Sequence, residues 1–335
     1  MKDSRGERLT SLVVCAGAGG MALGLEQAGF EPVLLLDNRP VVCESLRLNR
    51  PGWQVLETDL LEFDPVDHQE TYDVDLLVGG LPRVKASAAV TREDTGEELR
   101  LLVATIMLVH GVQPRALLLE NLPDLVSKPA YASIRSDIAA ELDHLGYRHR
   151  WFVVNAMDHG VPQDRKQGLL VAFKGDHLDD FVAPGPGTTP PPTVGEALGA
   201  SMAAGGWPHA AAWAAQADRV APTLVGGSWN RGGADLGPTG SKRAWERMRV
   251  NGGTVFDEVP GPDFPWDLSL GVKGMVSLTV EQAARLQGFP DDWSFAGLKT
   301  VRYRQVAHAS PPPVARALGR AVKTALGLRS APVMD

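Results

Sequence analysis

An arginine stands in the sequence where a nucleophile would be expected. The stretch DLLVGGLPRVKAS, Asp75 to Ser87, is an apolar run that ends in two glycines, a Leu-Pro pair and Arg83. A buried strand that ends in such a loop can deliver a reactive side chain, but a guanidinium stays protonated at cellular pH and is no nucleophile. Arg83 has therefore either replaced a functional residue without taking a new role, or it contacts a phosphate or carboxylate, to which arginine forms paired hydrogen bonds.

A second group of residues indicates an adenosine-containing ligand. The glycine-rich segment CAGAGG, Cys15 to Gly20, follows an apolar run and opens a helical pattern, which places backbone N–H groups and the positive end of a helix near a ligand. Asp37 ends the second apolar run, where an acid can bind ribose hydroxyls, and Asp59 follows the third, where an acid can bind an adenine amine. The alternative is that the glycines only permit close packing and that both acids cap helices.

Alternating strands and helices must position these residues. The apolar runs LTSLVVCAG and EPVLLLD flank a helical pattern, and DVDLLVGG, RALLLENL, HRWFVVNAMD and QGLLVAF continue the series. Continuous apolar strands separated by helices indicate an α/β fold with a doubly wound, mostly parallel sheet covered on both faces. A proline- and glycine-rich linker near residues 185–192 precedes a loop-rich region, which predicts a second, smaller domain.

The composition excludes several classes of protein. The chain has 335 residues, 44% of them hydrophobic, and its polar start leads directly into the first strand, so we expect a cytoplasmic globular protein without a membrane segment. Two cysteines without CxxC or Cys/His spacing predict neither disulfides nor a metal site. The net charge of -7 argues against a uniformly basic surface, although residues 219–249 carry six basic side chains and two acidic ones.

Six ordered blocks resemble the signature motifs of the DNA cytosine-5 methyltransferases. They are SLVVCAGAGGMALGLEQAGF, DLLVGGLP, LLLENLPDL, HGVPQDRKQGLLVAF, RLQGFPDDW and YRQVAHASPPPVARALG, and together they cover about residues 10–325. The resemblance implies an S-adenosylmethionine-binding methyltransferase domain at residues 1–184. It also implies a small target-recognition domain at 193–275 and a C-terminal segment, 276–335, that returns to the large domain.

The chemistry of this family makes Arg83 the central departure. Its members flip a cytosine out of the duplex and add a cysteine thiolate to C6, which activates C5, while a glutamate holds N3 protonated. The resemblance places Arg83 at the cysteine of the GGxPC loop. It places Glu120 and Asn121 at the Glu-Asn-Val block. Arg165 matches the first arginine of the QxRxR block, but Gln167 replaces the second, which helps to orient the base.

The cofactor positions depart less from the family pattern. Val13 replaces an acid often found in the first strand, and Ala307 with His308 replaces a Gly-Asn pair that contacts the methionine end of the cofactor. Because Asp37 and Asp59 remain, nucleoside binding is better supported than methyl transfer. The residues that the resemblance assigns to S-adenosylmethionine are Cys15, Ala16, Gly17, Gly19, Gly20, Asp37, Asn38, Asp59, Leu60, Gly80 and His308.

Three functions fit this pattern. The first is a pseudo-methyltransferase that keeps the fold, and the cofactor as a structural ligand, and acts by binding duplex DNA, an active methyltransferase or another protein. The second is a methyltransferase that modifies a nucleobase or small molecule without a cysteine. The third is an ordinary cytosine methyltransferase with another nucleophile, for which Cys15 and Cys43 are poor candidates because both lie in or beside the cofactor-side βαβ unit. The DNA contacts we expect come from Lys242, Arg243, Arg247 and Arg249.

Overall fold

Two compact units make up the chain in this computed structural model, which describes residues 9–84, 96–227 and 233–327. Unit 1 contains residues 1–154, 166–185 and 314–335, and unit 2 contains 155–165 and 186–313. The passage from unit 1 to unit 2 after residue 185 falls at the start of the expected linker. Of the segment 276–335, residues 276–313 belong to unit 2, and the chain returns to unit 1 at Val314.

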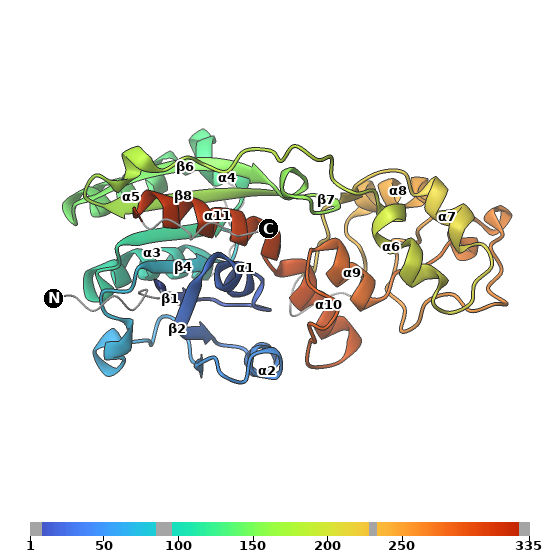
Figure 1. Cartoon of the computed structure of the whole chain (residues 1–335), viewed down its shortest axis with the longest axis horizontal. Coiled ribbons are helices and arrows are strands. Elements are labelled where there is room, and N and C mark those ends of the chain that lie inside the picture. The colour runs from blue at the N-terminus through green and yellow to red at the C-terminus, as the bar shows by residue number, and fades with distance from the viewer. Residues whose placement is uncertain (1–8, 85–95, 228–232, 328–335) are drawn as a thin grey trace, which may run out of the picture. The chain divides into compact units, whose positions relative to one another are not determined.

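Unit 1 is built on a mostly parallel sheet, as the sequence predicts (Figure 1). Within the described residues the strand order is β3-β2-β1-β4-β5-β8-β6. Strands β1 to β5 pair in parallel, whereas β8 runs antiparallel to β5. The strand bounds are β1 Leu9–Val14, β2 Phe30–Asp37, β3 Val55–Glu57, β4 Leu76–Gly80, β5 Ala116–Asn121, β6 Tyr147–Asn155 and β8 Lys166–Lys174.

Helices cover both faces of this sheet, which explains why most residues of its central strands are apolar and buried. On one face α11 packs closely on α1, where a Cβ on Gly319 would lie 2.7 Å from the Cβ of Ala28. On the other face α3 and α5 pack together over a core of buried leucines and valines. The helix bounds are α1 Gly20–Ala28, α2 Pro40–Asn49, α3 Glu97–Val112, α4 Pro123–Ser127, α5 Ala132–His144 and α11 Pro312–Ala325.

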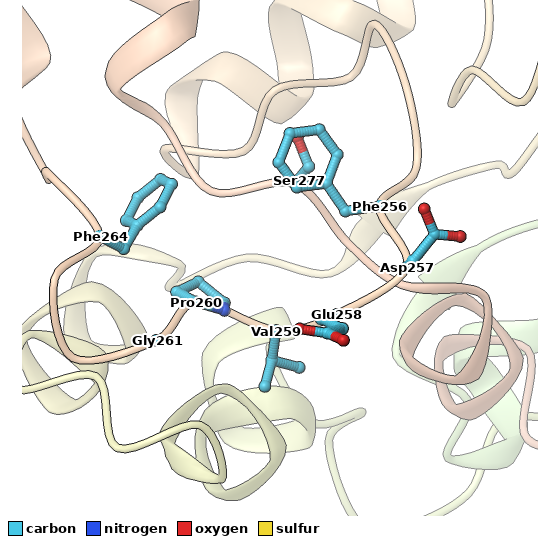
Figure 2. Close-up of a pocket in the computed structure, with 8 residues that line it drawn as sticks. All are labelled: Phe256, Asp257, Glu258, Val259, Pro260, Gly261, Phe264 and Ser277. Carbon is cyan, nitrogen blue, oxygen red and sulfur yellow. The ribbon is translucent and has the colours of Figure 1, made fainter.

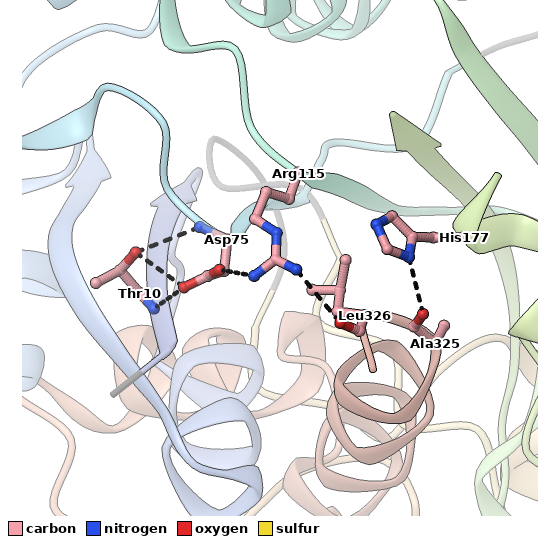
Figure 3. A network of polar contacts seen from close by, with 6 residues as sticks. All are labelled: Thr10, Asp75, Arg115, His177, Ala325 and Leu326. Carbon is pink, nitrogen blue, oxygen red and sulfur yellow. Dashed lines mark hydrogen bonds and ion pairs between the residues drawn. The ribbon is translucent and has the colours of Figure 1, made fainter. Parts of the chain in front are cut away.

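A polar network fastens the end of α11 where β1, β4 and β5 begin (Figure 3). The Asp75 carboxylate accepts a hydrogen bond from the backbone N–H of Thr10 at 2.9 Å and pairs with the Arg115 guanidinium at 2.7 Å. Arg115 also donates to the carbonyl of Leu326 at 3.3 Å, and Nδ1 of His177 lies 3.2 Å from the carbonyl of Ala325. These side chains satisfy carbonyls that the helix end leaves without intrahelical partners.

Unit 2 is mainly helical and loop-rich. Reciprocal capping boxes begin two of its helices, with Thr193 and Glu196 at α6 and Thr279 and Gln282 at α9. No helix in the described parts of either unit is long and apolar enough to cross a bilayer. The elements of unit 2 are β7 Gln163–Asp164, α6 Val194–Ala203, α7 Ala210–Gln216, β9 Ala221–Pro222, α8 Thr239–Arg247, α9 Val280–Leu286 and α10 Lys299–His308.

Candidate cofactor and catalytic site

The carboxyl ends of β1, β2, β4 and β5 meet at one edge of the sheet and bring most of the expected site residues of unit 1 together. Parallel pairing aligns Val14 with Gly79, and Gly80 with Glu120. A Cβ on Gly80 would lie 3.8 Å from the carbonyl oxygen of Cys15, so the loops after β1 and β4 approach closely. In open α/β sheets, ligands bind in the crevice outside these strand ends.

The glycine-rich loop after β1 turns directly into α1. Cys15 and Gly17 adopt positive φ angles of 49° and 54°, and Gly19 caps the helix at φ 85° in the left-handed region. No side chain caps this end of α1, and its first turn holds no acid. The first backbone N–H groups of the helix are therefore available to a ligand.

Asp37 holds this loop from the end of β2. One carboxylate oxygen accepts the N–H of Gly17 at 2.9 Å, and the other accepts the N–H of Arg39 at 3.0 Å. Burial raises the pKa of the Asp37 carboxyl, while these N–H donors and the Arg39 guanidinium oppose that shift. A carboxylate has about four lone-pair sites, so two N–H bonds leave acceptor capacity for ribose hydroxyls.

The segment after β3 lies beside the same acid. The N–H of Thr58 donates to the carbonyl of Asp37 at 3.1 Å, which fixes the position of the following residue, Asp59. Asp59 is half-buried, and one of its carboxylate oxygens accepts the N–H of Leu61 at 2.9 Å. Leu60 is buried, whereas Asn38 is exposed. The alternative that these acids have local structural roles is supported by the same bonds, since Asp37 and Asp59 each bind a nearby backbone N–H.

Arg83 lies at the end of a loop whose backbone is held on both sides. Asn121 donates to the carbonyl of Pro82 at 3.0 Å and accepts the N–H of Val84 at 3.1 Å. The hydroxyl of Tyr131 donates to the carbonyl of Val84 at 3.3 Å. The Arg83 side chain is exposed and makes no hydrogen bond or ion pair with residues that the structure describes. Residues 85–87 of this loop lie outside the described ranges.

Neither cysteine offers a substitute nucleophile. Burial, reinforced by the negative charge of Asp37, raises the pKa of the Cys15 thiol to about 12 and that of the Cys43 thiol to about 11. The thiol of Cys43 also donates to the carbonyl of Asp37 at 3.4 Å. Since the thiolate is the reactive form, both side chains are unreactive near neutral pH.

Arg165 and His308 belong to unit 2. The guanidinium of Arg165 is buried and donates to the carbonyls of Leu224 at 3.2 Å and Ala307 at 3.0 Å. His308 is exposed at the end of α10, with Nε2 3.1 Å from the carbonyl of Gly227. Both residues therefore fix loops of unit 2, whereas Glu120 and Gln167 lie on the sheet of unit 1.

Gln163 is a structural residue that the sequence did not single out. Its buried amide donates to Gln287 at 2.6 Å and to the carbonyl of Leu286 at 3.1 Å. Its oxygen accepts the N–H of Leu224 at 2.9 Å. The sequence could have indicated this role, because Gln163 stands two residues before Arg165 in the QDR segment. Alternate residues of an extended segment face the same side, so the two side chains are expected to share one environment.

The four cations expected to contact DNA differ in their local contacts. Lys242 pairs with Asp235 at 3.3 Å, and Arg249 donates to the side chain of Gln216 at 3.0 Å. Arg243 and Arg247 are exposed one helical turn apart on α8 and make no hydrogen bond or ion pair within the described part of the chain. These two are free to contact phosphates.

A cavity of about 300 Å³ opens elsewhere in unit 2 (Figure 2). The rings of Phe256 and Phe264 contribute apolar walls, and Asp257 and Glu258 add two carboxylates. Asp257 is paired with Lys299 at 2.8 Å, and no basic side chain among the described residues lines the cavity, so a DNA phosphate would have no cation to contact there. None of the site residues expected from the sequence lines this cavity.

The strand order and the ligand-binding edge define an α/β protein of the S-adenosylmethionine-dependent methyltransferase fold. Solved structures agree with this class. A putative DNA modification methyltransferase encoded within an E. coli prophage has a TM-score of 0.65 at 19% identity, covering 95% of this chain and 99% of that one. The Dnmt2 methyltransferase of S. pombe has a TM-score of 0.61 at 16% identity, covering 96% and 99%.

The chain belongs to the C-5 cytosine-specific DNA methylase family, which it matches over residues 9–324. It is 41% identical over 323 residues to the Type II methyltransferase M.NaeI of Lentzea aerocolonigenes, covering 96% of this chain and 76% of that protein. It is 40% identical over 323 residues to M.NgoMIV of Neisseria gonorrhoeae, covering 95% and 98%. The resemblance seen in the sequence blocks is thereby confirmed at the level of the family.

Proposed function

We propose that this chain is a catalytically impaired member of its family that binds S-adenosylmethionine, DNA or both in a regulatory or partner role. The observation that carries the proposal is Arg83, which follows β4 at the position that the resemblance assigns to the nucleophile. A guanidinium cannot add to C6 of cytosine. The two cysteines of the chain, with thiol pKa values raised to about 12 and about 11, supply no replacement.

Cofactor binding is supported by the chemistry of the sheet edge. S-adenosylmethionine would bring an adenosine, and in an active enzyme it supplies the methyl group. The uncapped N–H groups at the start of α1 suit the polar end of such a ligand, and the free lone pairs of Asp37 suit ribose hydroxyls. Asp59 would accept from the adenine amine. The other residues proposed to contact the cofactor are Cys15, Ala16, Gly17, Gly19, Gly20, Asn38, Leu60, Gly80 and His308.

Binding of this ligand is tested by calorimetry with S-adenosylmethionine and S-adenosylhomocysteine. We expect Asp37→Ala to abolish binding, because it removes the ribose acceptor and loosens the Gly17 loop. Glu31→Ala, at an exposed position of the same strand, is the matched control and should bind like the unchanged chain. Equal affinities for both variants would contradict the proposed cofactor site.

DNA binding is supported by Arg243 and Arg247, with Lys242 and Arg249 contributing less because each already has a partner. Such contacts are to phosphates, so affinity should fall steeply as salt rises, and charge reversal at Arg243 and Arg247 should reduce the slope. No binding of duplex DNA at low salt would leave a protein partner or a small molecule as the remaining ligand class.

The absence of cytosine methylation is tested directly. The protein is incubated with S-adenosylmethionine carrying a labelled methyl group and with unmethylated genomic DNA, and the hydrolysed nucleosides are analysed by mass spectrometry. We expect no 5-methylcytosine above the level of protein-free controls, with an active relative as positive control. Protein-dependent 5-methylcytosine would refute the proposal. Label in another nucleobase, or in a small molecule from a cell extract, would instead identify a methyltransferase that works without a cysteine.

A further inference from the structure

The walls of the cavity in unit 2 are fastened to the rest of that unit. The loop 256–264 supplies all but one of the lining residues. The N–H of Phe256 donates to the carbonyl of Leu278 at 2.9 Å, which joins the start of the loop to the chain just before α9. A Cβ on Gly205 would lie 2.4 Å from the carbonyl oxygen of Pro260, so the loop also packs closely on the chain that follows α6. The shape of the cavity is therefore supported from two sides.

The lining of the cavity is largely apolar and partly aromatic. Phe256 and Phe264 contribute their rings, together with Val259 and Pro260. The buried ring of Trp207 packs edge-on with Phe264, with centroids 5.6 Å apart and planes at 87°. The face of a phenyl ring attracts a cation that lies within about 6 Å of its centroid. A volume of about 300 Å³ is at the small end of the range for ligand sites, so the cavity suits a ligand the size of an amino-acid side chain.

One carboxylate at the cavity is not balanced by a cation. Asp257 is paired with Lys299 at 2.8 Å, whereas Glu258 is exposed and makes no hydrogen bond or ion pair with residues that the structure describes. Figure 2 shows the Glu258 carboxylate and the two phenyl rings on different sides of the same space. Residues 250–272 contain four acids and no lysine, arginine or histidine. The local negative potential therefore favours a cation over an anion.

A buried hydroxyl on the same cavity also has no partner. Ser277 is 2% exposed, and its Oγ makes no hydrogen bond within the described part of the chain. A buried polar atom without a hydrogen bond is unfavourable, so an N–H group of a ligand that reached this oxygen would be stabilised there. The Phe256 side chain on the same cavity is 45% exposed, so it has room to turn toward solvent and admit such a group.

We propose that this cavity binds an organic cation, a guanidinium or ammonium group on a short apolar stem. The charged group lies between Glu258 and the phenyl rings, the stem contacts the apolar wall, and one N–H donates to Ser277. The inference is independent of the proposed function and concerns unit 2 alone. The same chemistry is carried by an arginine or lysine side chain of a protein partner and by a small free cation.

Ligand-observed NMR titration of the full-length protein with n-butylguanidinium tests the site. For a ligand this small we expect a dissociation constant of about 1–20 mM. n-Butylurea has the same shape without the charge and should bind at least about fivefold more weakly, because it lacks the attraction to Glu258 and to the rings. No saturable binding below about 100 mM, or equal affinity for n-butylurea, would overturn the proposal.

Three variants locate the site, and thermal melting shows that each is folded. Glu258→Gln should weaken binding of n-butylguanidinium at least about threefold, because it removes the charge. Asp263→Asn changes an exposed acid of the same loop that does not line the cavity, and as the matched control it should bind normally at physiological salt. Ser277→Ala should weaken n-butylguanidinium about threefold but leave n-butyltrimethylammonium, which has no N–H, unaffected. Equal effects of the two acid substitutions, or full affinity in Ser277→Ala, would contradict the proposed site.

A second titration distinguishes the two sources of the cation. The peptide acetyl-Gly-Arg-Gly-amide carries the same guanidinium on a peptide backbone. If the natural ligand is a protein side chain, the peptide should bind at least as tightly as n-butylguanidinium, and Glu258→Gln should weaken both equally. Binding of n-butylguanidinium without binding of the peptide would identify a small free cation. Peptide binding that Glu258→Gln leaves unchanged would overturn the assignment of the cation to this cavity.

Discussion

Introducing a thiol at position 83 distinguishes a proposed site that lacks only a nucleophile from one whose geometry is also unsuited to the reaction. In Arg83→Cys the backbone on either side stays held, because Asn121 bonds both Pro82 and Val84. The side chain at this position is exposed, so the introduced thiol should keep an ordinary pKa of about 8.5. We predict that this variant still fails to form an efficient covalent complex with cytosine.

The expected deficit follows from two factors. A thiol of ordinary pKa is only a few per cent thiolate at pH 7, which costs a factor of about 30 against a fully ionised nucleophile. The resemblance assigns Gln167 to the position of a base-orienting arginine, so we expect the base to be poorly placed, and a misplacement of about 1 Å between reacting atoms costs about 100-fold. The product is a rate roughly 3,000 times lower, which corresponds to about 4.7 kcal/mol in the barrier.

The assay uses a duplex in which 5-fluorocytosine replaces cytosine, with S-adenosylmethionine present. After thiol addition to C6 and methyl transfer to C5, the fluorine blocks elimination and the protein stays attached to DNA on a denaturing gel. Arg83→Ser is the control, because it removes the guanidinium without adding a nucleophile. Trapping by Arg83→Cys at a rate within about tenfold of an active relative would refute the reasoning, since it would show an intact site that Arg83 alone silences.

Three further predictions concern stability and are checked by urea denaturation. Arg115→Ala should lower the free energy of unfolding by about 1–2 kcal/mol, because it removes bonds to a partly buried carboxylate and to the end of α11. Arg148→Ala, which breaks a fully exposed ion pair, should leave the free energy of unfolding nearly unchanged. Gly168→Ala should cost about 3 kcal/mol or more, because its Cβ would lie 2.3 Å from a backbone carbonyl oxygen, and Gly185→Ala, with open space around it, should be nearly neutral. Burial lowers the pKa of His159 in the folded protein. The contribution of the neutral imidazole to stability is therefore complete above the unfolded-state pKa of 6.5, and it is lost as the pH falls through 6.5 toward the folded-state pKa. His159→Leu should flatten this pH dependence of stability, and an unchanged pH profile would contradict the prediction.

The sheet of unit 1 could be predicted because its signal is local. Strands β5 and β1 contain the runs ALLL and LVV, in which successive residues are apolar, as expected of a strand covered on both faces. The antiparallel pairing of β8 with β5 was not predictable in this way, because a buried strand has the same apolar pattern in either direction. The start of the returning segment at Val314 depends on long-range packing, in which Gly319 approaches Ala28, and no local pattern encodes that contact.

The candidate site was predictable only in part. Asp37 and Gly80 end their strands, Cys15 follows β1, and Glu120 is the second-last residue of β5. Parallel pairing alone brings these strand ends to one edge. The local contacts of the cations on α8 could not be read from the sequence, because the partner of Lys242 lies in the preceding loop. A count of basic residues therefore overstates the number of free charges in this segment.

Residues of the family pattern that this chain retains, such as Asn121 and Arg165, also stabilise the fold, whereas Arg83, which departs from the pattern, does not. Asn121 is buried and bonds the loop on both sides of Arg83, and Arg165 is buried against two carbonyls of unit 2. Replacing either would leave unsatisfied polar groups, at about 1–3 kcal/mol each, whether or not methylation occurs. Arg83 is exposed and bonds nothing among the described residues, so we expect a substitution at this position to have little effect on stability. Retention of Asn121 and Arg165 is therefore no argument for activity.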